Sequence, residues 1–314
     1  MPNDEKPLVS VCCLAYNHAP YIRDCLEGFL MQQTDFPFEV LIHDDASTDG
    51  TADIIREYEA KYPEIIKPIY QTENQYSKGV NVGIKMFDRT RGKYIAFCEG
   101  DDFWCDPQKL RTQYDFMEAH PDYSACFCGN YVLNEFERCI TPLGFQSSDF
   151  PPDTRDAQRR ILLGDHSLCT AAAFFRADVF KAFQSALAED VNRAPMGDLQ
   201  IFFHLAGAGR IQYIRRRMFA YRRHAGSASS YGDPRQQPKF LARYAQSIGD
   251  LAQRYGFGDL RDEINPSCEV RRSFLHRVLR RIKRSLRGDF RVYRAYRKQT
   301  GRQRILLVGA FLPE

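Results

Sequence analysis

Three carboxylates stand within four positions where an apolar segment ends. Glu99, Asp101 and Asp102 follow the apolar run 93–98, and Gly100 between them lets the backbone approach a ligand closely. Carboxylates so close together repel one another unless a cation neutralises them. Mg²⁺ is often held by one or two carboxylates together with substrate phosphates. The segment therefore favours a site for Mg²⁺ or Mn²⁺ over an exposed acidic turn.

A second carboxylate pair, Asp44 and Asp45, follows the apolar run 39–43 and precedes the polar segment 46–51. In doubly wound α/β folds, ligands bind beyond the carboxyl ends of the strands. A carboxylate there can accept a hydrogen bond from a nucleobase N–H or a ribose hydroxyl. The alternative is that one of the two only caps the following helix. This segment alone does not decide between the two interpretations.

Two further titratable residues stand beside apolar segments later in the chain. Asp198 precedes the stretch 201–205, where a carboxylate is a candidate general base and equally a candidate helix N-cap. His224 follows Arg222 and Arg223, so it could face a diphosphate or complete the coordination shell of a metal. A single histidine in a loop is more often simply solvated, so His224 by itself is weak evidence.

The segments between these groups predict the elements that must position them. Short, nearly continuous apolar runs predict four strands, and apolar residues at helical spacing predict helices between them. Alternation of strand and helix predicts a Rossmann-like, mostly parallel sheet covered by helices. The predicted strands are 9–14, 39–43, 65–70 and 93–98; the helices are 21–30, 54–62 and one starting at Asp106–Pro107; later segments predict strands 123–133 and 213–221, a buried helix 199–206 and a surface loop 226–237.

Composition agrees with a globular protein and argues against several other classes. The 314 residues are 44% hydrophobic and 27% charged, and no apolar stretch approaches the roughly 20 residues that span a bilayer. The short polar start, residues 1–6, predicts no secretory signal, and we expect a cytoplasmic protein. The ten cysteines include the adjacent pair Cys12 and Cys13 in an apolar run and no C-x-x-C pair, so we expect mostly buried free thiols.

Taken in order, four segments resemble glycosyltransferase family 2. They are 9–17 (V-S-V-C-C-L-A-Y-N), 44–51 (D-D-A-S-T-D-G-T), 99–110 (E-G-D-D-F-W-C-D-P-Q-K-L) and 196–198 (M-G-D). The resemblance covers about residues 7–230. It implies the GT-A fold, in which a Rossmann-like nucleotide-binding domain merges with an acceptor-binding region. It also implies an inverting transferase that uses a nucleotide-sugar donor, and cell-surface polysaccharide or glycolipid synthesis as its setting.

By this resemblance, the donor-binding residues are Tyr16, Asn17, Asp44, Asp45, Glu99 and Asp101. Tyr16 would stack on the nucleobase, most often uracil, and Asp45 would contact its edge with support from Asp44. Segment 99–102 resembles the family's D-x-D motif, although its first position here is glutamate.

The resemblance also assigns the metal ligands and the general base. Asp101 and Asp102, with His224, would bind the divalent metal, Mg²⁺ or Mn²⁺, on the diphosphate. Asp198 resembles the catalytic base, which takes the proton of the acceptor hydroxyl as that hydroxyl attacks the anomeric carbon. No covalent nucleophile is needed.

A basic extension is expected after the domain 7–230. Residues 231–314 include the segment 271–304, in which 14 Lys and Arg stand against one acid, Asp289. Apolar residues at helical spacing from Phe274 to Leu286 predict an amphipathic helix. Such a helix can lie on an anionic membrane surface, which would suit a lipid-linked acceptor. Packing on the protein body or on a second subunit is the alternative, and no nucleic-acid-reading motif accompanies the charge.

Two other functions compete with sugar transfer. A nucleotidyltransferase also uses acidic metal ligands on a Rossmann-like sheet, but it usually has a Gly-rich phosphate loop near the N-terminus, which residues 15–20 are not. A catalytically silent nucleotide-sugar-binding module would not need Asp45, Asp101, Asp102 and Asp198 all to be present. The identities of the sugar and the acceptor do not follow from the sequence, because loops carry that specificity.

Overall fold

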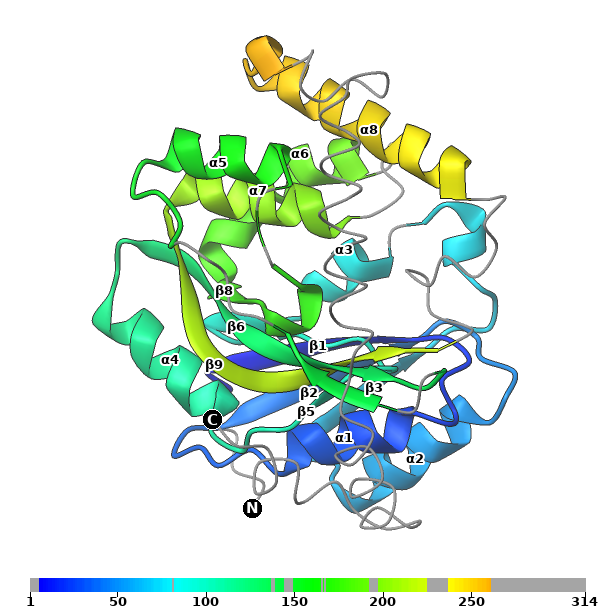
Figure 1. Cartoon of the computed structure of the whole chain (residues 1–314). Helices are drawn as coiled ribbons and strands as arrows, with labels where there is room; N and C mark the ends of the chain where they lie inside the picture. Colours follow the sequence, from blue (N-terminus) through cyan, green and yellow to red (C-terminus); the bar gives the residue numbers. More distant parts are fainter. Residues whose placement is uncertain are drawn as a thin grey trace.

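A single mixed sheet forms the centre of the molecule (Figure 1). The computed structural model describes residues 6–80, 82–136, 139–143, 149–164, 166, 168–191, 197–224 and 237–260. The strands are β1 (Val9–Ala15), β2 (Phe38–Asp44), β3 (Ile66–Tyr70), β4 (Tyr94–Phe97), β5 (Phe103–Trp104), β6 (Tyr123–Asn134), β7 (Cys139–Pro142), β8 (Phe174–Arg176) and β9 (Arg210–Arg223). Their order across the sheet is β3-β2-β1-β4-β8-β6-β9-β5, and β7 pairs with β6.

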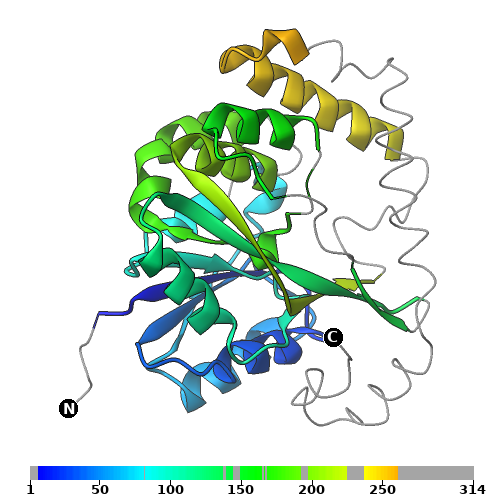
Figure 2. The ribbon, with the colours of Figure 1, turned by 60° about the vertical axis from the view of Figure 1, so that its left-hand side comes forward.

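Helices cover both faces of this sheet. They are α1 (Ile22–Leu30), α2 (Thr51–Lys61), α3 (Val82–Phe87), α4 (Lys109–Ala119), α5 (Thr154–Leu162), α6 (Ala177–Val191), α7 (Asp198–Ala208) and α8 (Gln237–Arg254). Figures 1 and 2 show α1 and α2 on one face and α5, α6 and α7 on the other. The side chains of α8 reach α7, since Gln200 Nε2 donates to Ser247 Oγ at 2.9 Å.

The first half of the sheet is parallel and matches the predicted elements. Strands β1, β2, β3 and β4 pair in parallel, and their bounds differ from the predicted ones by at most one residue at each end. In this register Ala15 lies opposite Asp44. The carboxyl ends of β1 and β2 therefore meet at one edge of the sheet, together with the segment that follows β4.

The second half of the sheet is mixed. Strand β8 runs antiparallel to both β4 and β6, β9 runs parallel to β6, and β5 runs antiparallel to β9. The predicted strands 123–133 and 213–221 are confirmed as β6 and β9, and the predicted helix 199–206 as α7. The helix expected from Asp106–Pro107 begins only at Lys109. The reason is that the Asp106 carboxylate accepts the N–H of Gln108 in a turn before the helix and pairs with Arg216.

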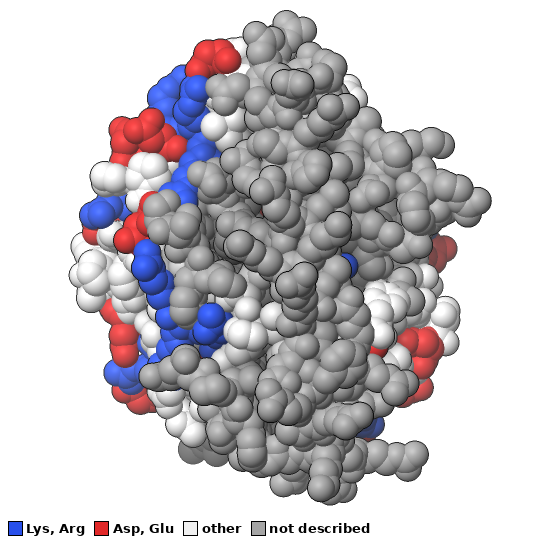
Figure 3. All heavy atoms as spheres, in the orientation of Figure 1, with Lys and Arg blue, Asp and Glu red and all other residues white. Residues whose placement is uncertain are grey.

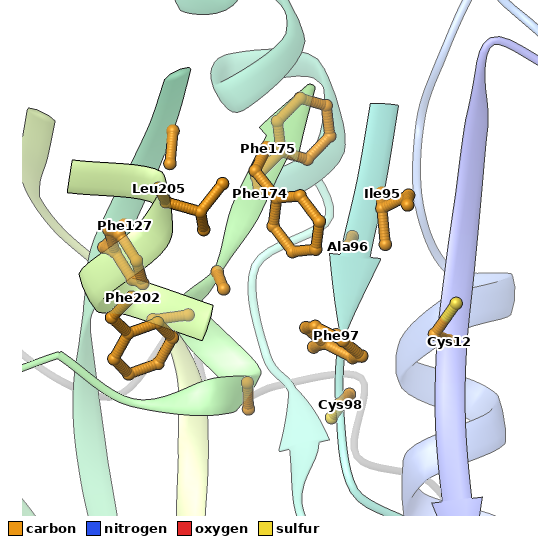
Figure 4. Packing of buried hydrophobic residues seen from close by; sticks show 14 of the residues in the cluster. Cys12, Ile95, Ala96, Phe97, Cys98, Phe127, Phe174, Phe175, Phe202 and Leu205 are labelled. Carbon is orange, nitrogen blue, oxygen red and sulfur yellow. The ribbon is translucent and has the colours of Figure 1, made fainter. Parts of the chain in front are cut away.

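Aromatic packing anchors α7 on the sheet (Figure 4). The ring of Phe202 meets that of Phe127 on β6 edge to face, with centroids 5.0 Å apart. Leu205 of α7 is also fully buried, as are Phe174 and Phe175 of β8. Offset and edge-to-face aromatic pairs add to the burial energy and restrict orientation. This packing sets the position of the first turn of α7, where Asp198 lies.

Close packing of α1 against β5 leads to a stability prediction. A Cβ on Gly28 would lie 2.8 Å from the backbone oxygen of Trp104 and 2.9 Å from its nitrogen, so α1 or β5 would have to move. We expect Gly28→Ala to destabilise the fold by about 1–3 kcal/mol, as overpacking does. Gly249→Ala in α8 is the matched control, since nothing lies within 4 Å of its added Cβ. The control should be stabilising by about 0.5–1 kcal/mol, and chemical denaturation of both variants measures the difference.

The charged surface of the described residues is largely paired. Figure 3 shows Lys and Arg along one flank, over α5 and β9, with Asp and Glu beside them. Arg159 pairs there with Asp259, and Arg216 pairs with Asp106. None of the helices in the described part of the chain is both long and apolar enough to span a lipid bilayer. The basic segment 271–304 and the predicted domain boundary at 230/231 lie outside the described residues.

The predicted state of the cysteines is confirmed wherever the structure describes them. Eight cysteines are free, and all but the half-buried Cys169 are buried. Half of them lie on β1 and β6, two on each strand, as expected for small apolar side chains.

Candidate functional site

The loop after β1 presents an exposed aromatic ring. Tyr16 is 46% exposed, although it follows the buried strand directly. The next residue, Asn17, has a left-handed backbone with φ 55°. Its Oδ1 accepts the N–H of Thr48 at 2.8 Å, and its own N–H donates to Ser47 Oγ at 2.9 Å. Asn17 thus joins the loops that follow β1 and β2 and leaves the Tyr16 ring accessible to a ligand.

The carboxylate pair after β2 is buried, and its two members have different surroundings. Asp45 accepts the N–H groups of Gln75 at 2.8 Å and Tyr76 at 3.0 Å, so it holds the loop after β3. Asp44 accepts the N–H of Ser47 at 3.3 Å with one oxygen, while its buried Oδ1 has no hydrogen-bond partner among the described residues. A buried acceptor without a partner costs stability. Asp44 Oδ1 therefore keeps an unused hydrogen-bond acceptor.

The acidic turn after β4 lies directly against the loop after β1. The N–H of Gly100 donates to the backbone oxygen of Leu14 at 2.9 Å. A Cβ at position 100 would lie 2.9 Å from both His18 Nδ1 and Ile22 Cδ1. Glycine is thus needed because the two segments approach so closely. The same contact brings the Glu99–Asp102 turn next to the Tyr16 loop.

Asp101 and Asp102 of the turn have different hydrogen-bond partners. Asp101 accepts from His224 Nε2 at 3.0 Å, and His224 packs on the ring of Tyr21 with centroids 4.2 Å apart. Asp102 is buried and accepts the N–H of Arg222 at 2.7 Å. Burial and the neighbouring carboxylates Asp101 and Glu99 raise the pKa of Asp102 well above its ordinary value. Of these acids, Asp101 is the one paired with the predicted metal-binding histidine.

Asp198 joins this group from the opposite side of the sheet. It is the first residue of α7, after the N-cap Gly197, and its Oδ1 accepts the N–H of the adjacent Leu199 at 2.9 Å, so it does not cap the helix from the preceding position. Burial raises its pKa. Burial and the charges of Asp102, Asp198 and Glu99 together raise the pKa of the Cys169 thiol. Glu99, Asp102 and Asp198 are therefore all close enough to Cys169 for their charges to act on its thiol.

The raised pKa of Glu99 leads to a prediction of how the stability of the fold depends on pH. Burial, followed by the charge of Asp101, raises the pKa of Glu99 to about 7. A carboxyl group whose pKa is higher in the folded than in the unfolded state favours folding when protonated. That contribution is complete below the unfolded-state pKa near 4.5 and is lost as pH rises through about 7. We expect Glu99→Gln to flatten this decline, as measured by urea denaturation from pH 4 to pH 8. The same slope in wild type and variant would contradict the assignment.

Whether the site suits a divalent metal depends on the donors it presents. In the described part of the chain, no three His, Cys, Asp or Glu side chains are placed together to hold an ion. The Asp101–His224 pair does offer a carboxylate and an imidazole 3.0 Å apart. Because Mg²⁺ and similar ions often take only one or two protein ligands beside phosphates and water, this pair fits an ion that arrives with a diphosphate. The metal assignments of Asp101, Asp102 and His224 stay predictions.

Sequence reasoning did not single out the role of Arg222. Arg222 and Arg223 were noted only as neighbours of His224, whereas the Arg222 side chain in fact turns inward to Asp24 and Glu135. The sequence did contain a pattern that links Arg222 with His224. Alternate residues of a strand share a face, and these two residues are two positions apart. The predicted strand ended at residue 221, whereas β9 continues to Arg223, so this rule was not applied to the two residues.

Comparison with known proteins agrees with this arrangement. The family model for glycosyl transferase family 2 matches residues 10–183. An uncharacterized protein of Mycobacterium tuberculosis is 36% identical over 235 residues, which cover 73% of this chain and 63% of that protein. This chain thus spans less than two thirds of that relative. The putative teichuronic acid biosynthesis glycosyltransferase TuaG of Bacillus subtilis is 42% identical over 112 residues, 36% of this chain and 42% of TuaG.

Solved structures show the same fold. The crystal structure of residues 1–349 of S. aureus TarS in complex with UDP-GlcNAc matches with a TM-score of 0.56 and 22% identity. The match covers 77% of this chain and 66% of that one. The predicted GT-A architecture, a sheet flanked by helices, is confirmed by this likeness and by the family model. Since that model covers more than half of the residues, the chain belongs to glycosyl transferase family 2.

Proposed function

We propose that this protein is an inverting glycosyltransferase. It would move a sugar from a nucleotide diphosphate donor, with UDP as the nucleotide, to a hydroxyl of a glycan or lipid-linked acceptor. The observation that carries the proposal is the convergence of Asp198 from α7 with the turn Glu99–Asp102 after β4, beside the exposed ring of Tyr16. The similarity to TuaG, which is named for teichuronic acid biosynthesis, supports cell-surface polysaccharide as the product class.

The nucleotide would bind at the carboxyl ends of β1 and β2. The Tyr16 ring offers a stacking surface for the base, which gains about 1–3 kcal/mol by such contacts. Asp44 Oδ1 has an unused acceptor for a base N–H or a ribose hydroxyl. Asp45 already accepts two backbone N–H groups, so its part in base recognition includes holding the loop at residues 75–76. UDP is proposed because the structurally similar TarS binds UDP-GlcNAc.

The diphosphate would lie near Asp101 and His224. A Mg²⁺ or Mn²⁺ ion bound by these residues would neutralise charge on the leaving diphosphate. The carboxylate suits either ion and the imidazole suits Mn²⁺ better than the harder Mg²⁺, and Asp102 would support the turn from its buried position. Metal dependence is thus part of the proposal.

Asp198 would act as the general base. Its raised pKa brings the carboxylate closer to the range in which a base is effective at neutral pH. The proton of the acceptor hydroxyl passes to Asp198 as the hydroxyl oxygen attacks the anomeric carbon. The bond to the diphosphate breaks on the opposite face, so this single displacement inverts the anomeric configuration.

A donor panel tests this proposal. UDP-, GDP- and dTDP-sugars are screened by thermal shift with and without Mn²⁺, and the best ligands are then assayed for release of nucleoside diphosphate. A ligand at 100 times its Kd should stabilise the fold by about 2.7 kcal/mol. We expect Mn²⁺-dependent stabilisation and release with a UDP-sugar. Binding without any release would favour a silent module, and pyrophosphate release from a nucleoside triphosphate and a sugar phosphate would favour a nucleotidyltransferase.

A further inference from the structure

Arg222, near the end of β9, is a charged side chain in a buried place. Its side chain is only 3% exposed, which is costly for a cation without partners. Its Nη2 donates to Asp24 of α1 at 2.6 Å and its Nη1 to Glu135, just after β6, at 2.8 Å. Three elements that are distant in the sequence are thus joined through one guanidinium.

The same residue binds the acidic turn through two separate groups. Its main-chain N–H donates to Asp102 Oδ1 at 2.7 Å, and its Nε donates to the backbone oxygen of Asp101 at 2.9 Å. Arg222 therefore binds two consecutive residues of the turn. A lysine could not make these contacts together, because the planar guanidinium has several donors in a fixed geometry.

Aromatic rings complete the surroundings of the guanidinium. Its carbon lies 5.0 Å from the ring centroid of Tyr21 and 5.2 Å from that of Phe103, within the range of cation–π attraction. The Tyr21 ring also packs on His224. Arg222 thus reaches both members of the Asp101–His224 pair, one by a hydrogen bond and the other through Tyr21.

We propose that Arg222 is a positioning residue. It holds the Asp101 carboxylate and the His224 imidazole at the separation and orientation that binding of the metal–diphosphate group requires. The role rests on the proposed function and deepens it. Arg222 itself does not reach toward the donor, because its side-chain donors are directed to Asp24, Glu135 and the Asp101 backbone. Its effect on transfer passes entirely through the geometry of the pair.

The test compares Arg222→Lys and Arg222→Met with Arg210→Met. Arg210 begins the same strand, is 44% exposed and pairs with Asp122 away from the turn, so it is the matched control. The first readout is the imidazole NMR signal of His224 in the metal-free protein at fixed pH, assigned with a His224→Ala variant. The second is the affinity for UDP with Mn²⁺, and thermal unfolding reports whether each variant is folded.

For the folded Arg222 variants we expect the His224 signal to move to its position in an Asp101→Asn variant. Affinity for UDP with Mn²⁺ should fall by about tenfold or more, as for the loss of residues that orient metal ligands. Arg210→Met should change neither readout. If the Arg222 variants fail to fold, the double variant Asp24→Asn with Glu135→Gln keeps Arg222 but removes the charges of two of its partners. This double variant should shift the same His224 signal.

An unchanged His224 signal together with unchanged UDP affinity, in any folded variant of this set, would overturn the positioning role. Failure of the wild-type protein to bind or cleave any nucleotide sugar would overturn the proposed function instead. The NMR comparison needs no donor, so it separates these two outcomes.

Discussion

Replacing Asp198 with Asn is expected to lower kcat about 10²–10⁴-fold while leaving donor affinity near that of the wild type. The magnitude is that of a lost general base. Asparagine keeps the shape and the acceptor oxygen that receives the Leu199 N–H, so α7 should stay in place. The asparagine side chain, however, cannot take the proton of the acceptor hydroxyl. Steady-state kinetics with saturating donor, together with donor titration by calorimetry, measure the two parts of the prediction.

Asp178→Asn is the matched control for this variant. Asp178 lies in the first turn of α6 and accepts the N–H of the next residue, Val179, at 2.8 Å, as Asp198 does for Leu199. Any general effect of the substitution at the start of a helix should appear in both variants, whereas loss of transfer should appear only at Asp198. Normal turnover by Asp198→Asn would remove this residue from the role of base.

Asp101→Asn is expected to abolish the gain in donor affinity that Mn²⁺ provides. The carboxylate is the charged member of the pair with His224, and an amide is a much weaker ligand for a hard cation. We expect affinity for UDP in the presence of Mn²⁺ to fall by about 100-fold, and affinity in its absence to change little. Titrations of UDP with and without Mn²⁺ give both values.

The control for charge removal is Asp53→Asn. Asp53 lies on α2, its side chain is 81% exposed, and it pairs with the nearby Arg56 in a bond that contributes little. This variant should bind UDP and Mn²⁺ as the wild type does. Should Asp101→Asn keep the full Mn²⁺ effect, the metal would have to bind elsewhere.

The elements that were predictable from sequence are those whose pattern is local. Strands β1 to β4 are nearly continuous apolar runs, and α1 buries Ile22, Cys25, Leu26 and Phe29 at helical spacing. Their alternation was enough to predict the parallel half of the sheet and the edge at which ligands bind. The donor-binding and metal assignments followed from the family resemblance together with this edge.

The remaining features depend on contacts between distant residues. Strand β5 has only two residues and exists because Phe103 and Trp104 pair with Ala220 and Phe219 of β9. The antiparallel placement of β8 between β4 and β6 has no local signature either. In the site, the bond from Arg222 to Asp24 joins residues 198 positions apart. A pattern read along the chain predicts none of these pairings.

The most direct measurement of the central claim is a crystal structure of the protein grown with Mn²⁺ and UDP, with the ion located by its anomalous signal. The account predicts one Mn²⁺ site in contact with the Asp101 carboxylate, His224 and the diphosphate, with the uracil against Tyr16 and Asp198 facing the space beyond the terminal phosphate. An ion and nucleotide bound away from the edge formed by β1, β2 and the Glu99–Asp102 turn would contradict it.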